Sequence, residues 1–229
     1  MDSNVLNFLM SESILIPIII GAIRIKSLNK AYYPFFVFLL LGLLSELVSF
    51  ILIEKFKTSN AADIKVYSLV ECCIVLYLLY VWQNSARHRQ LFIFLAAICI
   101  IFWIVECVIF LNINTWSPYF RVFYAFVIVL LSVNQINAMM FDHDEPLYKN
   151  PMFIISLGFI IIFLYQIIEE AAYYIGADQP TVSDKITVSD KIIIGYGYIN
   201  FFVNAMYGVA IFIITTKSKD EYNQYFKQG

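Results

Sequence analysis

The chain has 229 residues, of which 61% are hydrophobic and only 14% are charged, and its mean hydropathy is +0.77. An ordinary soluble domain carries about 25% charged residues, so this composition indicates an integral membrane protein. The net charge of -2 argues against a surface for nucleic acid. All four cysteines lie in apolar runs without CxxC or Cys/His spacing, which argues against a disulfide framework and a zinc site.

Apolar runs of about 20 residues, the length that a helix needs to cross a bilayer, recur along the whole chain. They predict seven spans, at about 5–24, 32–54, 64–83, 90–111, 119–141, 151–175 and 192–216. Ser117-Pro118 and Asn150-Pro151 each place a capping residue before a proline at a helix start, and Pro17 is expected to kink the first helix. The chain is therefore predicted to be all-α: one domain, residues 1–229, forming a bundle of seven transmembrane helices.

The lysines and arginines between the spans predict the orientation, because positively charged loops are favoured in the cytoplasm. One side carries Arg24, Lys26, Lys30, Arg87, Arg89, Lys149, Lys217, Lys219 and Lys227, and the other carries Lys55, Lys57, Lys65, Arg121, Lys185 and Lys191. This bias places the N-terminus outside and the C-terminus in the cytoplasm. The hexapeptide Thr-Val-Ser-Asp-Lys-Ile occurs twice, at 181–186 and 187–192, and we interpret it as a duplication in a tolerant outer loop.

Six acidic residues lie inside the predicted spans, apart from Glu54 at the last position of the second span. A carboxylate near the bilayer centre costs roughly 2.5–3.5 kcal/mol or more, so such residues usually line a functional cavity. Glu46 is expected near the middle of the bilayer, and Arg121 is the basic residue expected near the others, where it could pair with Glu106 or Glu170. The residues expected in the outer half of the bilayer are Glu12, Glu71, Glu106, Glu169 and Glu170.

Small and polar residues also recur at helical spacing, which indicates that these faces point toward one another. The stripes are Gly42, Ser45, Glu46 and Ser49; Ser68 and Glu71; Gln166, Glu169, Glu170 and Tyr173; and Gly197, Asn200, Asn204, Tyr207 and Gly208.

Two explanations of these polar residues stay open. Intramembrane amides such as Asn200, Asn204 and the group Asn134, Gln135 and Asn137 often link helices by hydrogen bonds worth about 0.6 kcal/mol each. The functional explanation is an acidic pocket whose ligand-binding residues are Glu46, Glu71, Glu106, Arg121, Glu169, Glu170, Tyr173, Asn200 and Asn204.

Several intramembrane activities lack the residues that they require. The last span has no lysine for a retinal Schiff base, and neither HExxH nor Glu-x-x-His occurs. The two histidines, His88 and His143, fall on predicted inner loops. These gaps weigh against an enzyme. Carboxylates alone can bind a hard metal ion, so an intramembrane enzyme stays as a third alternative, with its metal and cofactor undetermined.

Four short segments resemble a family of small bacterial seven-helix membrane proteins. They are Leu44-Ser-Glu-Leu47, Val66-Tyr-Ser-Leu-Val-Glu71, Tyr119-Phe-Arg-Val122 and Asn150-Pro-Met-Phe153. The resemblance spans most of the chain and implies a seven-helix fold and a sensory role beside signalling kinases. It implies no activity, and the Glu169-Glu170 pair departs from the family's pattern. The expected location is a bacterial inner membrane.

The leading interpretation is a sensory or ligand-binding membrane protein whose outward-facing acidic pocket takes a cation or an amine-bearing small molecule. Its signal would pass to a partner protein at the basic inner loops. The alternative is a proton-coupled secondary transporter with Glu46 as the coupling site. Residues 5–83 and 119–216 show no convincing sequence match, which weighs against the inverted repeat of a transporter. The identity of the ligand, the partner and the oligomeric state are not predicted.

Overall fold

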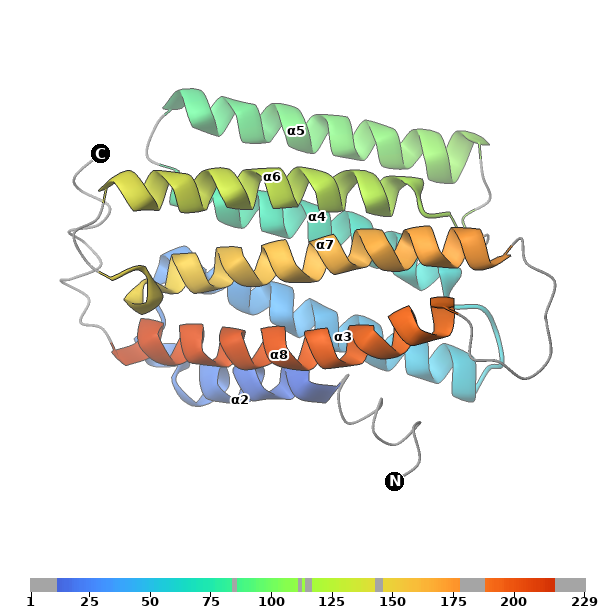
Figure 1. Cartoon of the computed structure of the whole chain (residues 1–229), viewed down its shortest axis with the longest axis horizontal. Coiled ribbons are helices and arrows are strands. Elements are labelled where there is room, and N and C mark those ends of the chain that lie inside the picture. The colour runs from blue at the N-terminus through green and yellow to red at the C-terminus, as the bar shows by residue number, and fades with distance from the viewer. Residues whose placement is uncertain are drawn as a thin grey trace.

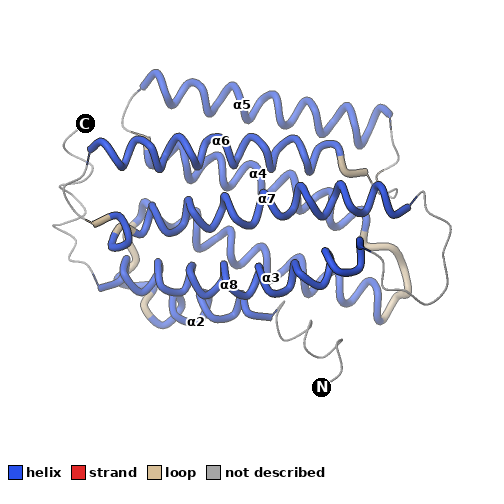
Figure 2. The backbone as a smooth tube through the Cα atoms, in the orientation of Figure 1, coloured by secondary structure: helices blue, strands red, loops and turns tan. Residues whose placement is uncertain are grey.

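The structure is a computed structural model that describes residues 12–83, 86–110, 113, 117–142, 146–177 and 188–216. This described part of the chain is helical and has no strand, which confirms the all-α class. Long helices that follow one another in the chain run antiparallel, so that the connections gather at the two ends of the bundle (Figures 1 and 2). The long helices are α3 (Tyr33–Glu54), α4 (Ala61–Trp82), α5 (Ala86–Ile104), α6 (Tyr119–Asp142), α7 (Pro151–Ala177) and α8 (Val188–Thr216).

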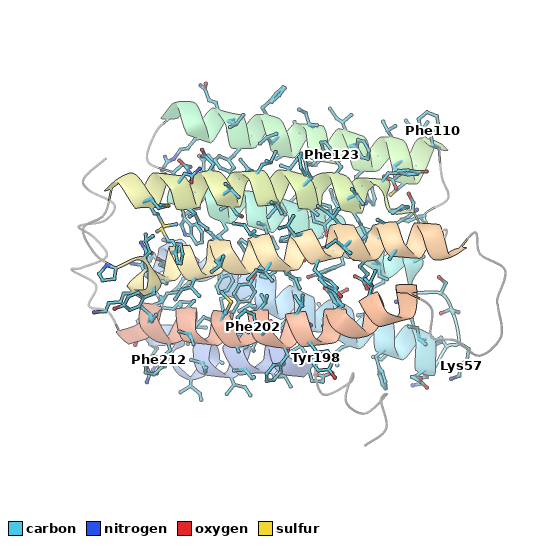
Figure 3. The ribbon with its side chains drawn as sticks, viewed as in Figure 1. Lys57, Phe110, Phe123, Tyr198, Phe202 and Phe212 are labelled. Atoms are coloured by element: carbon cyan, nitrogen blue, oxygen red, sulfur yellow. The ribbon has the colours of Figure 1, made fainter. Side chains whose placement is uncertain are left out.

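Six helices of the described chain are long and apolar enough to cross a membrane, α5 being extended by a π-helical segment over Val105–Phe110. Their outward faces carry large exposed apolar side chains, such as Phe110 at the end of α5 and Phe202 and Phe212 on α8 (Figure 3). In water such a surface would be costly, whereas lipid tails cover it without penalty. The fold is therefore consistent with an integral membrane protein.

The first predicted span is the exception, and the count of seven is not confirmed. Its residues 5–11 lie outside the described part of the chain. The remainder forms a 3₁₀ turn over Glu12–Ile14 and the short helix α2 (Leu15–Ile23), which packs against α8. Pro17 lies in the first turn of α2, where a missing N–H removes no helical hydrogen bond. The expected kink is replaced by a change from 3₁₀ to α-helix just before this proline.

Two predicted helix starts differ in how they are capped. Asn150 caps α7 as expected, because its side-chain oxygen accepts a hydrogen bond from the Met152 N–H at 2.9 Å, and Pro151 opens the helix. Ser117 does not cap α6 in the expected way, because its hydroxyl donates to the carboxylate of Glu106. The start of α6 is therefore held by a side chain from another segment.

An aromatic layer formed by Phe35, Phe38, Phe159 and Tyr207 fills the middle of the bundle between α3, α7 and α8. Their rings meet edge to face, with centroids 5.0 Å apart for Phe35 and Tyr207 and 5.5 Å apart for Phe38 and Phe159. Gly158 lets the Tyr207 ring approach α7, since a Cβ at this glycine would lie 2.4 Å from the ring. All four side chains are buried, so the layer fills the bundle interior on the side where α3 begins.

Candidate functional site

A cavity of about 300 Å³ lies between α3, α4, α6, α7 and α8, on the other side of the aromatic layer. We call it the central cavity. The predicted stripe of α3 lines it with Gly42, Ser45, Glu46 and Ser49, and the stripe of α8 lines it with Asn200, Asn204 and Tyr207. The structure thus brings together five of the predicted site residues, namely Glu46, Glu71, Arg121, Asn200 and Asn204.

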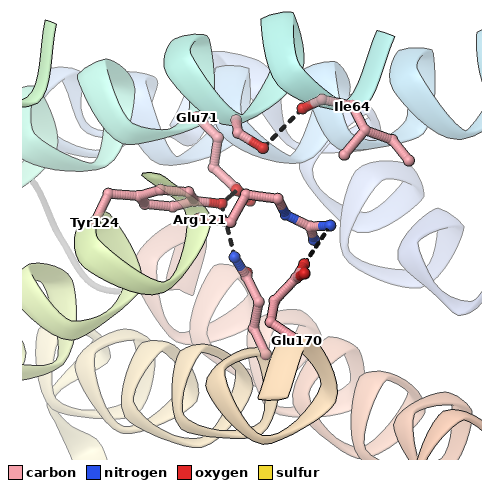
Figure 4. A network of polar contacts seen from close by, with 7 residues as sticks. Ile64, Glu71, Arg121, Tyr124 and Glu170 are labelled. Carbon is pink, nitrogen blue, oxygen red and sulfur yellow. Dashed lines mark hydrogen bonds and ion pairs between the residues drawn. The ribbon is translucent and has the colours of Figure 1, made fainter. Parts of the chain in front are cut away.

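Glu71 stands at the centre of a hydrogen-bond network on the α4 side of the central cavity (Figure 4). Tyr67, one helical turn earlier, donates its hydroxyl to Oε1 at 3.0 Å, and Tyr124 on α6 donates to Oε2 at 2.5 Å. The Tyr124 hydroxyl in turn accepts a hydrogen bond from Gln166 on α7 at 3.0 Å. Both carboxylate oxygens of Glu71 are therefore satisfied by the protein itself, and the network joins three helices.

Arg121 pairs with Glu170, one of the two partners that the sequence suggested. A guanidinium nitrogen lies 2.6 Å from the Glu170 carboxylate, and the side chains are only 18% and 1% exposed (Figure 4). Arg121 lines the central cavity, whereas Glu170 lines a second, mostly apolar hollow of about 470 Å³ between α5, α6 and α7. We call this hollow the lateral groove; its other lining residues include Phe102, Phe123 and Phe126.

Glu106 does not line the central cavity. Besides the Ser117 hydroxyl, its carboxylate accepts hydrogen bonds from the backbone N–H groups of Tyr119 and Phe120, the first residues of α6. A carboxylate at this position satisfies N–H groups that have no partner within the helix and interacts favourably with the helix dipole. Glu106 is therefore explained as the cap of α6.

Lys65 is a basic residue that the sequence interpretation placed on the outer side, at the start of the third predicted span. It lies in α4, its side chain is 5% exposed, and its ammonium acts electrostatically on the Glu106 carboxylate. Its backbone carbonyl also accepts a hydrogen bond from the Trp103 indole at 2.9 Å. Arg121 is thus one of two basic side chains among the intramembrane carboxylates.

Glu46 lines the central cavity, and its Oε2 is buried without a hydrogen-bond partner among the described residues. Glu106 also has a buried oxygen of this kind but lies outside the cavity wall. The serines beside it in the stripe are already engaged, since Ser45 and Ser49 donate to Asp63 on α4 at 3.3 and 2.7 Å. Asp63 was not among the predicted site residues, although its position in the first turn of α4 faces the end of α3.

The asparagines divide into two groups. Asn204 donates to the Ser13 hydroxyl at 2.9 Å and to the Asn200 side-chain oxygen at 3.2 Å, which links α8 to the turn before α2. On α6, Asn134 and Asn137 are exposed. Gln135 is buried, and Gln83 donates to its side-chain oxygen at 2.7 Å. Asn200 and Asn204 thus combine a helix-linking role with a place in the cavity wall, whereas the α6 group lies elsewhere.

The remaining predicted residues lie outside the cavity wall. Glu169 is half-buried on α7, where the charge of Arg121 acts on it, and Glu12 is half-buried in the 3₁₀ turn before α2. The backbone of Tyr173 belongs to α7, but its side chain lies outside what the structure describes. Glu71, Glu106, Glu169 and Glu170 are thus distributed over several environments.

Comparison of the chain with protein-family models, curated proteins and solved structures gives no match.

Proposed function

We propose that the protein is a ligand-binding, sensory membrane protein whose central cavity takes a cation or an amine-bearing small molecule. The observation that carries this proposal is the carboxylate of Glu46, which lines the central cavity and whose buried Oε2 has no partner among the described residues. A buried carboxylate oxygen left without a hydrogen bond is costly, and a positively charged donor would satisfy it. A ligand with such a donor would therefore be bound by the Glu46 carboxylate.

The proposal includes the membrane in which the protein lies and its orientation there. Lysine and arginine bias favours a C-terminus in the cytoplasm of a bacterial inner membrane, where the basic loops would contact a signalling partner. The central cavity then lies in the outer half of the bundle, since Ser49, Ile64 and Tyr196 lie toward the outer ends of their helices. Membership of the small bacterial seven-helix family belongs to the same proposal.

Binding without transport is favoured by the aromatic layer. Phe38 and Tyr207 line the inner end of the cavity, and Phe35 and Phe159 pack behind them. Passage of a ligand to the cytoplasmic side would require this layer to separate. A cavity closed at its inner end is what a receptor needs, whereas a transporter must open it during each cycle.

Thermal unfolding of the purified protein, measured with and without millimolar ammonium-bearing compounds and inorganic cations, tests the binding. A ligand at about 100 times its Kd stabilises by about 2.7 kcal/mol, or roughly 5–10 °C in Tm for a chain of this size. Glu46→Gln should abolish the shift. The control is Glu54→Gln on the same helix, whose side chain is 59% exposed and which should keep the shift.

Proteoliposomes that contain the same protein separate receptor from transporter. The proposal expects saturable binding of the stabilising compound and no accumulation when a proton gradient is applied. Accumulation driven by the gradient, and lost in Glu46→Gln, would replace the receptor by the transporter. Absence of any stabilising cation would remove the proposed function altogether.

A further inference from the structure

We infer that the ligand of the central cavity is an organic ammonium compound with an aromatic or other apolar portion, and not a metal ion. This inference rests on the proposed function and specifies its ligand class. It is drawn from how the cavity wall distributes charge, hydrogen bonds and aromatic rings between its two ends.

The first step is that two carboxylates line the cavity, of which only Glu46 has an oxygen without a partner among the described residues. The wall also holds Arg121, whose charge is paired with Glu170. Both oxygens of Glu71 accept tyrosine hydroxyls, and the hydroxyls of Ser45 and Ser49 are directed to Asp63. A hard ion such as Ca²⁺ takes about 6–8 oxygen ligands. In the described part of the chain, no group of three or more His, Cys, Asp or Glu residues is placed to hold a metal. One carboxylate suits an ammonium group instead.

The second step is that aromatic rings share the wall with Glu46. Phe38, Tyr67, Phe163, Tyr196 and Tyr207 all line the cavity. The negative face of an aromatic ring attracts an ammonium group, and the same rings cover apolar carbon. A wall of this kind is typical of sites for organic cations and is poor at replacing the water shell of a metal ion.

The third step is that Glu46 and the aromatic residue Phe38 lie at different depths in the central cavity. Phe38 precedes Glu46 by eight residues on α3, which corresponds to about 12 Å along the helix axis. Tyr207 at the inner end is 2% exposed and contributes mainly its ring, which packs against Phe38, together with one polar atom, its hydroxyl. A volume of about 300 Å³ equals that of about ten water molecules in the liquid, which suits a small molecule better than a single ion.

An arylalkylammonium ion matches this arrangement. Its ammonium group would pair with the carboxylate of Glu46, while its ring would reach Phe38 at the inner end of the cavity. Binding is non-covalent and needs no further reactant.

The experiment measures binding of four probes to the full-length protein in detergent, by calorimetry and by Tm. Phenethylammonium carries both the charge and the ring, phenethyl alcohol lacks the charge, ethylammonium lacks the ring, and Ca²⁺ represents a hard metal ion. Phenethylammonium should bind at least about tenfold more tightly than each of the others, because a hydrogen bond to a charged group and the aromatic contacts each contribute about this factor. This comparison uses the unmodified protein and does not depend on any variant folding.

Two variants then test which residue contacts the ammonium group of the ligand and which contacts its ring. Glu46→Gln should weaken phenethylammonium about tenfold or more and leave phenethyl alcohol unchanged. Phe38→Leu should weaken phenethylammonium and phenethyl alcohol alike and leave ethylammonium unchanged. Glu54→Gln should match the unmodified protein with every probe.

Equal or tighter binding of ethylammonium or Ca²⁺ would overturn the inference while leaving the proposed cation site in place. Equal binding of phenethyl alcohol and phenethylammonium would overturn both the inference and the role of Glu46. Failure of all four probes to bind would overturn the proposed function together with the inference.

Discussion

Replacing either Arg121 or Glu170 alone should lower the stability of the protein strongly. Replacing both together should lower it less. The ion pair between them is short, at 2.6 Å, and the Glu170 side chain is 1% exposed. Removing one partner of a buried pair leaves an uncompensated charge and costs about 3–5 kcal/mol. Because Arg121 is 18% exposed, we expect the lower end of this range, about 3 kcal/mol, for either Arg121→Gln or Glu170→Gln. For a chain of this size the loss in Tm is about 6–12 °C.

The double variant Arg121→Gln/Glu170→Gln should be more stable than either single variant, since no unpaired charge remains. Tryptophan fluorescence during thermal unfolding in detergent measures all four proteins of this cycle. The control is the exposed pair of Lys57 and Glu54, separated by 3.4 Å with side chains 74% and 59% exposed, whose removal should leave Tm unchanged. Glu169→Gln, beside Glu170 on the same helix, should cost less than Glu170→Gln. Additive losses in the double variant would refute the reasoning, because they would show that the two charges do not stabilise each other.

Three further predictions concern the network, the helix packing and the orientation. Tyr124→Phe should destabilise the protein by about 1–3 kcal/mol in the same assay, because one oxygen of Glu71 loses its donor; an unchanged Tm would contradict the network. Gly158→Ala should cost about 1–3 kcal/mol, because the added Cβ would lie 2.4 Å from the Tyr207 ring and α7 and α8 must separate; a neutral effect would place the two helices further apart. A reporter enzyme fused to the C-terminus should be active in the cytoplasm, and activity outside would reverse the proposed orientation.

The long helices could be predicted because apolar runs of bilayer length carry their own signal. The run at 32–54 becomes α3 at Tyr33–Glu54, and the run at 119–141 becomes α6 at Tyr119–Asp142. The structure of the first apolar run could not be predicted in this way. Hydropathy does not distinguish a 3₁₀ turn from an α-helix, and here the α-helix over Leu15–Ile23 begins only after a 3₁₀ turn. Helical periodicity likewise predicted the stripes of α3 and α8 that line the central cavity.

The roles of individual carboxylates could be predicted only in part. The spacing of Tyr67 and Glu71, four residues apart on one helix, contains the information for their hydrogen bond. The bond from Tyr124 to Glu71 and the capping of α6 by Glu106 depend on how distant segments meet. Periodicity on single helices cannot supply such partners, so a charge in an apolar run has the same appearance whether it caps a helix, forms an ion pair or faces a cavity.

The ion pair between Arg121 and Glu170 also lies between the central cavity and the lateral groove. Arg121 borders the central cavity, and Glu170 borders the lateral groove, whose rim includes the exposed side chains of Tyr119 and Phe126. The groove faces the surroundings of the bundle, which in a membrane are lipid tails. The ion pair therefore lies in the wall between the bundle interior and the hydrocarbon, with one charge bordering each side.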